Sequence, residues 1–154
     1  MKVAVVYYSK SGNTKKVAEA MANELGTGAK SIKDEPELEG VDLLFVGSGC
    51  YNKKLTGNMV EFLENLKGIK RAAVFGTYLG QTSAIESMKG ILEKKGIKVI
   101  DEWGCSGAFL YLMNKGRPNE KDLDRARQFA NSVLEKAMDS VKEVKVDGKE
   151  QGQA

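Results

Sequence analysis

The sequence has no histidine and only two cysteines among its 154 residues. Without histidine, Ser-His-Asp triads, Cys-His nucleophile pairs and histidine-ligated zinc or haem sites are excluded. Cys50 and Cys105 are far apart and form no Cys-x-x-Cys motif, which excludes thioredoxin-type chemistry and iron–sulfur ligation. We expect both cysteines to be small packing residues. Any chemistry must therefore use carboxylates, lysine or arginine, hydroxyls or a bound cofactor.

Long hydrophobic runs and strong net charge are absent as well. No stretch approaches the roughly 20 apolar residues that cross a bilayer, and Met1–Val6 is typical of a strand rather than of a signal peptide. We therefore expect a cytoplasmic protein with no membrane association. The net charge is only +3, lysine and glutamate alternate along the helical segments, and no arginine-rich arm indicates nucleic-acid binding.

The apolar pattern alternates between strand and helix periods along a length that fits one domain. Apolar or β-branched runs predict strands at Val3–Tyr8, Ala29–Lys33, Val41–Gly47 and Arg71–Gly76, with a last one beginning at Ile97. Helical spacing predicts helices at Thr14–Leu25, after a capping Thr56, from Ser83, and from a cap formed by Asn119 and Asp122. We expect a domain over residues 1–140 and a polar, disordered tail over residues 141–154.

Strands that alternate with helices predict an α/β fold, a doubly wound five-stranded parallel sheet with helices on both faces. The common strand order is 2-1-3-4-5, and ligands bind beyond the carboxyl ends of strands 1 and 3, where the winding reverses. The loops after strands 1, 3 and 4 are therefore expected to carry function.

The loop after the first strand, Ser9–Thr14, is rich in hydroxyl and amide side chains, and a helix follows it at once. Gly12 permits a tight turn, and exposed N–H groups with the helix dipole favour an anion. The loop has neither the Walker motif nor the pattern G-x-G-x-x-G. Hydroxyls with little cationic help suit a phosphate monoester held as a permanent cofactor. A turn that merely caps the helix is the alternative.

Residues 5–14, VVYYSKSGNT, resemble the first strand and phosphate loop of the flavodoxin family, written [ST]-x-[ST]-G-x-T. The likeness to the short-chain members extends over residues 2–138. It implies a flavodoxin-like fold, FMN as the cofactor, and transfer of single electrons between redox partner proteins. By position, the phosphate is bound by the side chains of Ser9, Ser11, Asn13 and Thr14 and by the backbone of Lys10, Gly12 and their neighbours.

The resemblance also implies that the loops after strands 3 and 4 line the two faces of the flavin ring. The first loop contributes Gly49, Cys50, Tyr51, Asn52 and Lys53. Tyr51 either stacks on the ring or is a rim aromatic. The second loop contributes Gly76, Thr77, Tyr78, Leu79 and Gly80, with Tyr78 or Leu79 covering the other face. No side chain is expected to act as acid, base or nucleophile, and no metal site is expected.

The charge of these loops departs from the family pattern, in which carboxylates surround the flavin. Residues 47–57 contain Lys53 and Lys54 but no acid, and residues 76–83 contain no acid. We therefore expect redox partners, a reductase donor and an acceptor enzyme, that have acidic docking patches. Less negative charge should also raise the potential at which the flavin becomes fully reduced, relative to acidic flavodoxins.

Other functions on the same topology remain open to different degrees. We expect a monomeric electron carrier rather than a stand-alone enzyme; an FMN-dependent NAD(P)H oxidoreductase and an accessory flavin subunit of a dedicated reductase are the alternatives. A response regulator needs an aspartate where Gly47, Ser48 and Gly49 stand, and a low-molecular-weight tyrosine phosphatase needs a Cys-x5-Arg loop after the first strand.

Overall fold

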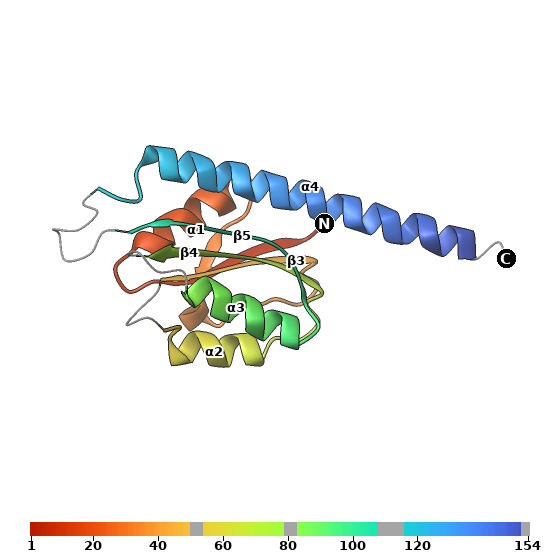
Figure 1. The fold of residues 1–154 in the computed structure, drawn as a ribbon, viewed down its shortest axis with the longest axis horizontal. Coiled ribbons are helices and arrows are strands. Elements are labelled where there is room, and N and C mark those ends of the chain that lie inside the picture. Colours follow the sequence, from red (N-terminus) through yellow and green to blue (C-terminus); the bar gives the residue numbers. More distant parts are fainter. Residues whose placement is uncertain (50–53, 79–82, 108–115, 152–154) are drawn as a thin grey trace.

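A computed structural model describes residues 1–49, 54–78, 83–107 and 116–151, without the side chains of residues 144–151 (Figure 1). Within these residues the elements follow in the order β1 (Val3–Tyr8), α1 (Asn13–Glu24), β2 (Ala29–Ser31), η1 (Ile32–Asp34), β3 (Leu43–Gly49), α2 (Gly57–Glu64), β4 (Arg71–Tyr78), α3 (Ser83–Lys94), β5 (Lys98–Ser106) and α4 (Glu120–Gln151). All the strand pairs are parallel, in the order β2-β1-β3-β4-β5. The predicted fold class and strand order are confirmed.

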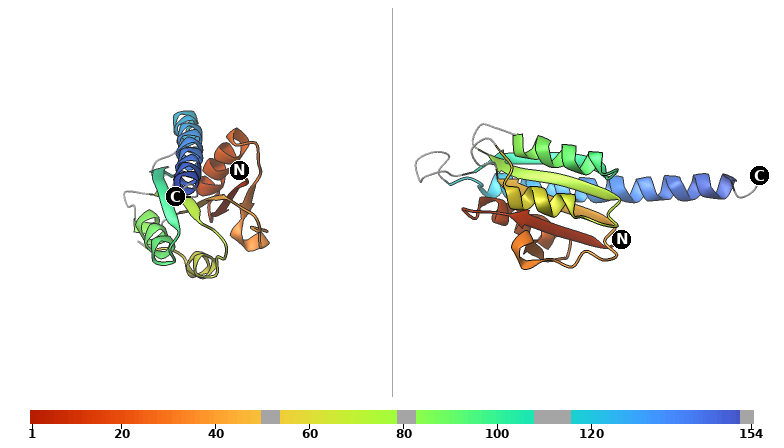
Figure 2. Two further views of the ribbon diagram at one scale, coloured as in Figure 1. Left: turned by 90° about the vertical axis from the view of Figure 1, so that its right-hand side faces the viewer. Right: turned by 90° about the horizontal axis from the view of Figure 1, so that it is seen from below.

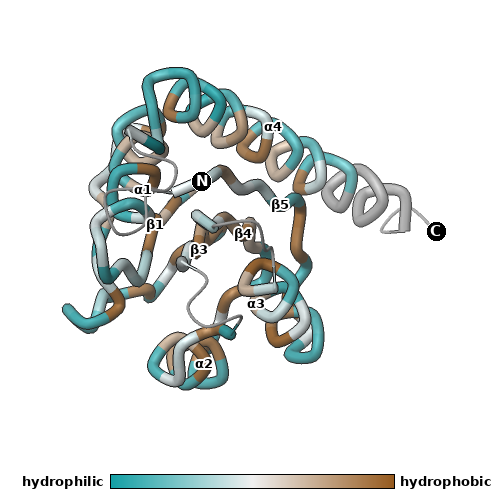
Figure 3. The backbone as a smooth tube through the Cα atoms, turned by 60° about the vertical axis from the view of Figure 1, so that its left-hand side comes forward, coloured by the Kyte–Doolittle hydropathy of each residue, from teal (hydrophilic) through white to brown (hydrophobic). Residues whose placement is uncertain are grey.

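The sheet is covered on both faces, which explains the nearly continuous apolar runs. One core contains alternate residues of β1, β3 and β4, such as Val5, Phe45 and Phe75, under α1 and α4. The other contains the intervening residues, such as Val46 and Val74, under α2 and α3. Figure 2 shows these two helical layers on either side of the sheet. In Figure 3 the apolar residues concentrate along the central strands and on the helix turns that face them.

A glycine in the middle strand makes room for Phe75, one of the largest fully buried side chains of the core. A Cβ atom on Gly47 would lie 2.1 Å from Phe75 Cε2, so the aromatic ring occupies the space that any other residue would need. The residues that follow, Ser48 and Gly49, continue β3 although their composition predicts a loop. β4 likewise continues two residues past the predicted end, to Tyr78.

Two predictions about helix ends differ from the structure. Thr56 is the residue before α2, but its side chain does not cap the helix. Its buried Oγ1 has no hydrogen-bond partner among the described residues, so the capping prediction is wrong. The helix α4 continues to Gln151, where the polar composition after Val141 predicts disorder. Lysine, glutamate and glutamine are strong helix formers, and an existing helix is extended at little cost.

Figures 1 and 2 show the last turns of α4 extending past the sheet. No helix in the described part of the chain combines the length and apolar character that a membrane span requires.

Candidate functional site

The turn between β1 and α1 leaves the start of the helix uncapped by a side chain. Gly12 precedes α1 with φ +90°, a left-handed conformation that glycine adopts without strain. The Gly12 N–H donates to Ser9 Oγ at 3.0 Å, which closes the turn. No acidic residue lies in the first turn of α1. The positive end of the helix dipole is therefore not neutralised from within the helix.

A buried hydrogen bond joins the start of α1 to the end of β4. Thr14 is 1% exposed and Thr77 is 6% exposed, and their Oγ1 atoms are 2.7 Å apart. Both residues were predicted to bind the cofactor through loops. The loop position predicted for Thr77 is wrong, because Thr77 lies inside β4, and the Thr14 hydroxyl turns toward the sheet. Their binding of the cofactor stays a prediction. The pair thus fixes the position of the first helical turn relative to the sheet edge.

Gly107, the residue after β5, also reaches the start of α1. A Cβ atom on Gly107 would lie 2.9 Å from Asn13 Nδ2, and the Gly107 N–H donates to the Tyr78 carbonyl at 3.0 Å. Three segments that are distant in sequence therefore meet at one edge. Gly107 is not among the predicted site residues, although a glycine directly after an apolar strand is a signal for a close approach of two segments.

Tyr78 ends β4 and lies on the opposite face of the sheet from Thr77. Its ring packs with Ile85 of α3, and a Cβ atom on Gly104 would lie 2.6 Å from Tyr78 Cε1. The ring is half-buried against β5 and α3 at the sheet edge. Gly49 and Gly76, two further predicted cofactor residues, are buried within β3 and β4 at the same edge.

The remaining predicted residues divide into two groups. Lys10 and Ser11 are exposed in the turn before α1. The predicted ring-lining residues outside the described residues are Cys50, Tyr51, Asn52, Lys53, Leu79 and Gly80. Among the described residues, no cluster of three acidic or cysteine side chains is suited to hold a metal ion.

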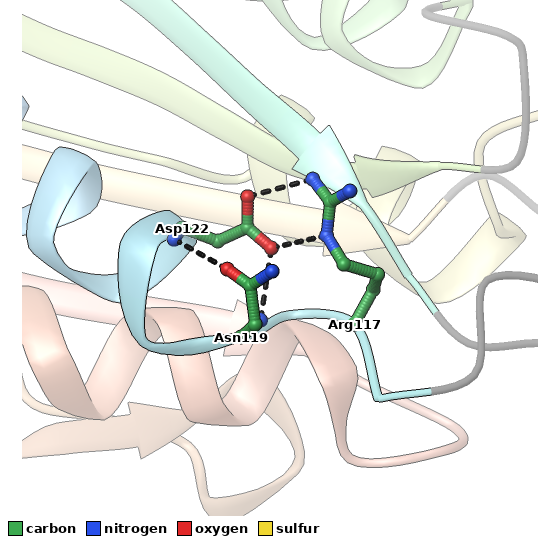
Figure 4. Close-up of polar contacts among 3 residues, drawn as sticks. All are labelled: Arg117, Asn119 and Asp122. Atoms are coloured by element: carbon green, nitrogen blue, oxygen red, sulfur yellow. Dashed lines mark hydrogen bonds and ion pairs between the residues drawn. The ribbon is translucent and has the colours of Figure 1, made fainter.

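An ion pair that the sequence analysis missed lies at the start of α4 (Figure 4). The Arg117 guanidinium donates through Nε and Nη2 to the two carboxylate oxygens of Asp122, the latter at 2.7 Å. The Asn119 N–H donates to Asp122 Oδ2 at 2.8 Å, and the Asp122 N–H donates to Asn119 Oδ1 at 3.0 Å. This reciprocal pair is a capping box, so the cap predicted from Asn119 and Asp122 is confirmed.

Burial and charge act in opposite directions on these groups. Asp122 is 2% exposed, and burial alone would raise its pKa, but the hydrogen bonds from Arg117 and from the Asn119 backbone hold that pKa below its ordinary value. Burial and the nearby Asp122 carboxylate raise the pKa of Cys105 to about 12. Cys105 is therefore a protonated, buried thiol at neutral pH, and its predicted packing role is confirmed.

Together, these features define an α/β protein in which the start of α1 and the carboxyl ends of β3, β4 and β5 lie at one edge of the parallel sheet. The family model described as Flavodoxin domain matches residues 4–110. An uncharacterized protein of Methanocaldococcus jannaschii is 32% identical over 149 residues, covering 87% of this chain and 99% of that protein. The flavodoxin-like domain-containing protein BilS of Clostridioides difficile is 32% identical over 121 residues, covering 70% of this chain and 66% of that protein.

A solved flavodoxin from the domain Archaea is 26% identical, with a TM-score of 0.71 over 90% of this chain and 99% of that chain. The chain belongs to the flavodoxin domain family and is a flavodoxin-like flavoprotein, as the resemblance in its first loop predicts.

Proposed function

We propose that this protein binds FMN at the start of α1 and transfers single electrons between redox partner proteins. The observation that supports this proposal is the turn at Gly12, which presents the uncapped first turn of α1 beside the hydroxyls of Ser9 and Ser11. When bound, FMN supplies the redox chemistry, and the chain supplies binding and orientation.

The donor set of this turn fits a phosphate monoester. Backbone N–H groups and hydroxyls are neutral donors, and the first turn of α1 has no carboxylate that would repel a phosphate. Ser9 Oγ accepts from Gly12 and donates to no group among the described residues, so its hydrogen is available to a phosphate oxygen. The contact between Thr14 and Thr77 holds these donors in place relative to the sheet edge.

The charges around this edge support a partner with an acidic docking surface. Lys10 and Lys54 are exposed beside the loops after β1 and β3. Lys33, which follows β2, places its Nζ atom 5.3 Å from the centre of the Tyr8 ring at the end of β1. Cations around a docking surface steer an oppositely charged partner. The monomeric state and the cytoplasmic location stay predictions.

The test is an absorbance spectrum of the purified protein, followed by titration of the flavin-free protein with FMN and stepwise reduction with dithionite. We expect a yellow protein, or uptake of one FMN per chain, and reduction in two separate one-electron stages. A colourless protein that takes up no FMN refutes the proposal. Rapid bleaching by NADPH alone, without a partner protein, favours an NAD(P)H oxidoreductase instead.

A further inference from the structure

Six cations gather at the edge of the sheet where β4 and β5 begin, opposite the proposed flavin site. The segments that lead into these two strands, with the first residue of each strand, contribute Lys67, Lys70, Arg71, Lys94, Lys95 and Lys98. We propose that this basic edge is a docking surface for an acidic protein partner, separate from the surface through which electrons would pass. The inference goes beyond the proposed function and does not require a bound flavin.

Three contacts bring the residues of the basic edge together, although they come from two separate connections. The Lys98 N–H donates to the Lys70 carbonyl at 3.0 Å, and Arg71 is the register partner of Lys98. Lys95 Nζ donates to the Glu64 carbonyl at 2.6 Å, which joins the end of α3 to the end of α2. The ends of α2 and α3 and the starts of β4 and β5 therefore form one continuous surface.

The charges of this surface have few partners within the protein. Five of the six residues are exposed, and Arg71 is half-buried. Apart from the contact of Lys95 with a carbonyl oxygen, no side chain of the basic edge makes a hydrogen bond or ion pair among the described residues. Asp101 and Glu102 of β5 are each paired with a lysine outside this edge. The six cations are therefore available to an external anion.

The excess of positive charge is local to β4 and β5. Residues 64–71 and 93–98, with both of their glutamates counted, carry a net charge of +4, which exceeds the +3 of the whole chain. The starts of β1 and β3 have no such excess, since Lys2 lies beside Asp42 and Glu39. A surface with this excess attracts a partner that carries carboxylates.

The last turns of α4 extend past the basic edge on one side. Lys136 of α4 donates to Asp101 Oδ2 at 2.8 Å, close to the start of β5. From there, helical and strand rises of about 1.5 and 3.3 Å per residue put the end of α4 on the order of 10 Å beyond the sheet (Figures 1 and 2). Arg71 and Lys98 lie on the face that α4 covers, because the next residue of each strand packs under α2 and α3. The basic edge and α4 thus form a corner.

This corner favours a protein over a membrane or a nucleic acid. A flat bilayer cannot lie against the edge, because α4 projects past it. No aromatic side chain is exposed in the described part of the chain, so bases find no stacking surface. The edge has one arginine among five lysines, which limits bidentate contacts to phosphate. Carboxylates on a folded partner can instead pair with individual lysines.

The position of the edge indicates a partner that holds the protein in place. Since β4 runs from Arg71 to Tyr78, its two ends are about 25 Å apart at roughly 3.3 Å per residue. A partner on the basic edge would therefore leave the turn at Gly12 and the surrounding loops free to meet a redox partner.

The experiment follows the backbone amide resonances of the nitrogen-labelled, full-length protein while a polyglutamate peptide is added. We expect the amides of residues 64–71 and 93–98 to shift, and the affinity that they report to fall as salt rises. Because these amides report on their own surface, peptide bound near residues 9–14 is measured separately.

Two triple variants with the same change of charge test the location. The edge variant carries Lys70→Gln, Arg71→Gln and Lys98→Gln, and it should weaken peptide binding at this edge about tenfold. The control variant replaces exposed residues of β2 and α4 and should change that affinity by less than about twofold; it carries Lys30→Gln, Lys121→Gln and Arg125→Gln. If the edge variant does not fold, Lys67→Gln with Lys94→Gln changes only residues outside the strands and should also weaken binding.

The outcomes separate this inference from the proposed function. Amides of the basic edge that do not respond to the peptide, or equal losses of affinity in both triple variants, overturn the docking surface. Tighter binding at this edge of single-stranded DNA, or of vesicles that contain phosphatidylserine, overturns the assignment to a protein partner. The edge variant should bind FMN as the wild type does, and a wild type that binds no FMN refutes the proposed function alone.

Discussion

The buried contact between Thr14 and Thr77 predicts a specific pattern of stability in a double-mutant cycle. Valine has nearly the shape of threonine but no hydroxyl. In the wild type, the Thr77 residue is 6% exposed and its hydroxyl oxygen lies 2.7 Å from that of Thr14. In Thr14→Val, the Thr77 hydroxyl stays buried but loses this partner. Leaving a buried hydroxyl unpaired costs about 1–3 kcal/mol. We expect each single valine substitution to lower the unfolding free energy by about that amount.

The double variant should be more stable than the sum of the two single effects. Replacing both hydroxyls leaves no unpaired polar atom and puts two methyl groups in contact, which is nearly neutral for stability. The coupling energy between the two positions should therefore be about 1–2 kcal/mol. The same contact holds the start of α1 against the sheet, so all three variants should also bind FMN more weakly than the wild type.

The assay is equilibrium urea unfolding of the flavin-free protein, followed by circular dichroism, so that ligand affinity does not enter the stability. Thr27→Val serves as the control because Thr27 is exposed after α1, and its substitution should change stability by less than about 0.5 kcal/mol. Additive effects in the double variant, or single variants as stable as the wild type, would refute the reasoning that this hydrogen bond fastens α1 to β4.

Three further predictions concern the same edge. Gly12→Ala and Gly26→Ala both introduce a side chain at positive φ, +90° and +74°, and each should lower the unfolding free energy by about 1 kcal/mol. Only Gly12→Ala should weaken FMN binding, measured by fluorescence titration. Equal losses of FMN affinity in the two variants would argue against the site. Because hydrogen bonds hold the pKa of Asp122 low despite burial, its contribution to stability is present above about pH 4 and is lost as pH falls through the folded-state pKa. In Asp122→Asn the unfolding free energy should therefore depend less on pH between about pH 5 and 2 than in the wild type. The same pH dependence in both proteins would contradict this. The rate of electron transfer to an acidic redox protein, measured by stopped flow, should fall as the salt concentration rises, whereas the rate to a basic haem protein should not. Rates that are insensitive to salt with both partners would contradict the docking proposal.

The parts of the fold that the sequence predicts well are those in which burial dictates composition. Val3–Tyr8 is predicted with the bounds that the structure has, because β1 is covered on both faces and its residues are apolar almost without interruption. The start and end of α1 are predicted within one residue, because Gly12 and Gly26 bracket an apolar stripe at helical spacing.

The strand ends are predicted less well because tertiary contacts override their composition. Gly, Ser and Thr at the ends of β3 and β4 are typical of loops. Yet Gly47 of β3 is required by the Phe75 ring, and a Cβ atom on Gly76 of β4 would lie 2.9 Å from the Ser48 carbonyl oxygen. The role of Thr77 is missed for the same reason, since its partner Thr14 lies 63 residues away in sequence. The cap of α4 is predicted because Asn119 and Asp122 lie only three residues apart in sequence.

The location of acidic residues, rather than the net charge, supports the proposed anion site between β1 and β3. The first turns of α1 and α2, which follow β1 and β3, have no acidic residue. The first turns of α3 and α4 contain Glu86, Glu120 and Asp122, which occupy the positive ends of those helices. The uncompensated helix dipoles therefore meet where the winding of the sheet reverses, the position at which parallel sheets bind ligands. Arg117 pairs with Asp122, the buried acid in the first turn of α4, so that this carboxylate adds no net negative charge at the edge of the sheet.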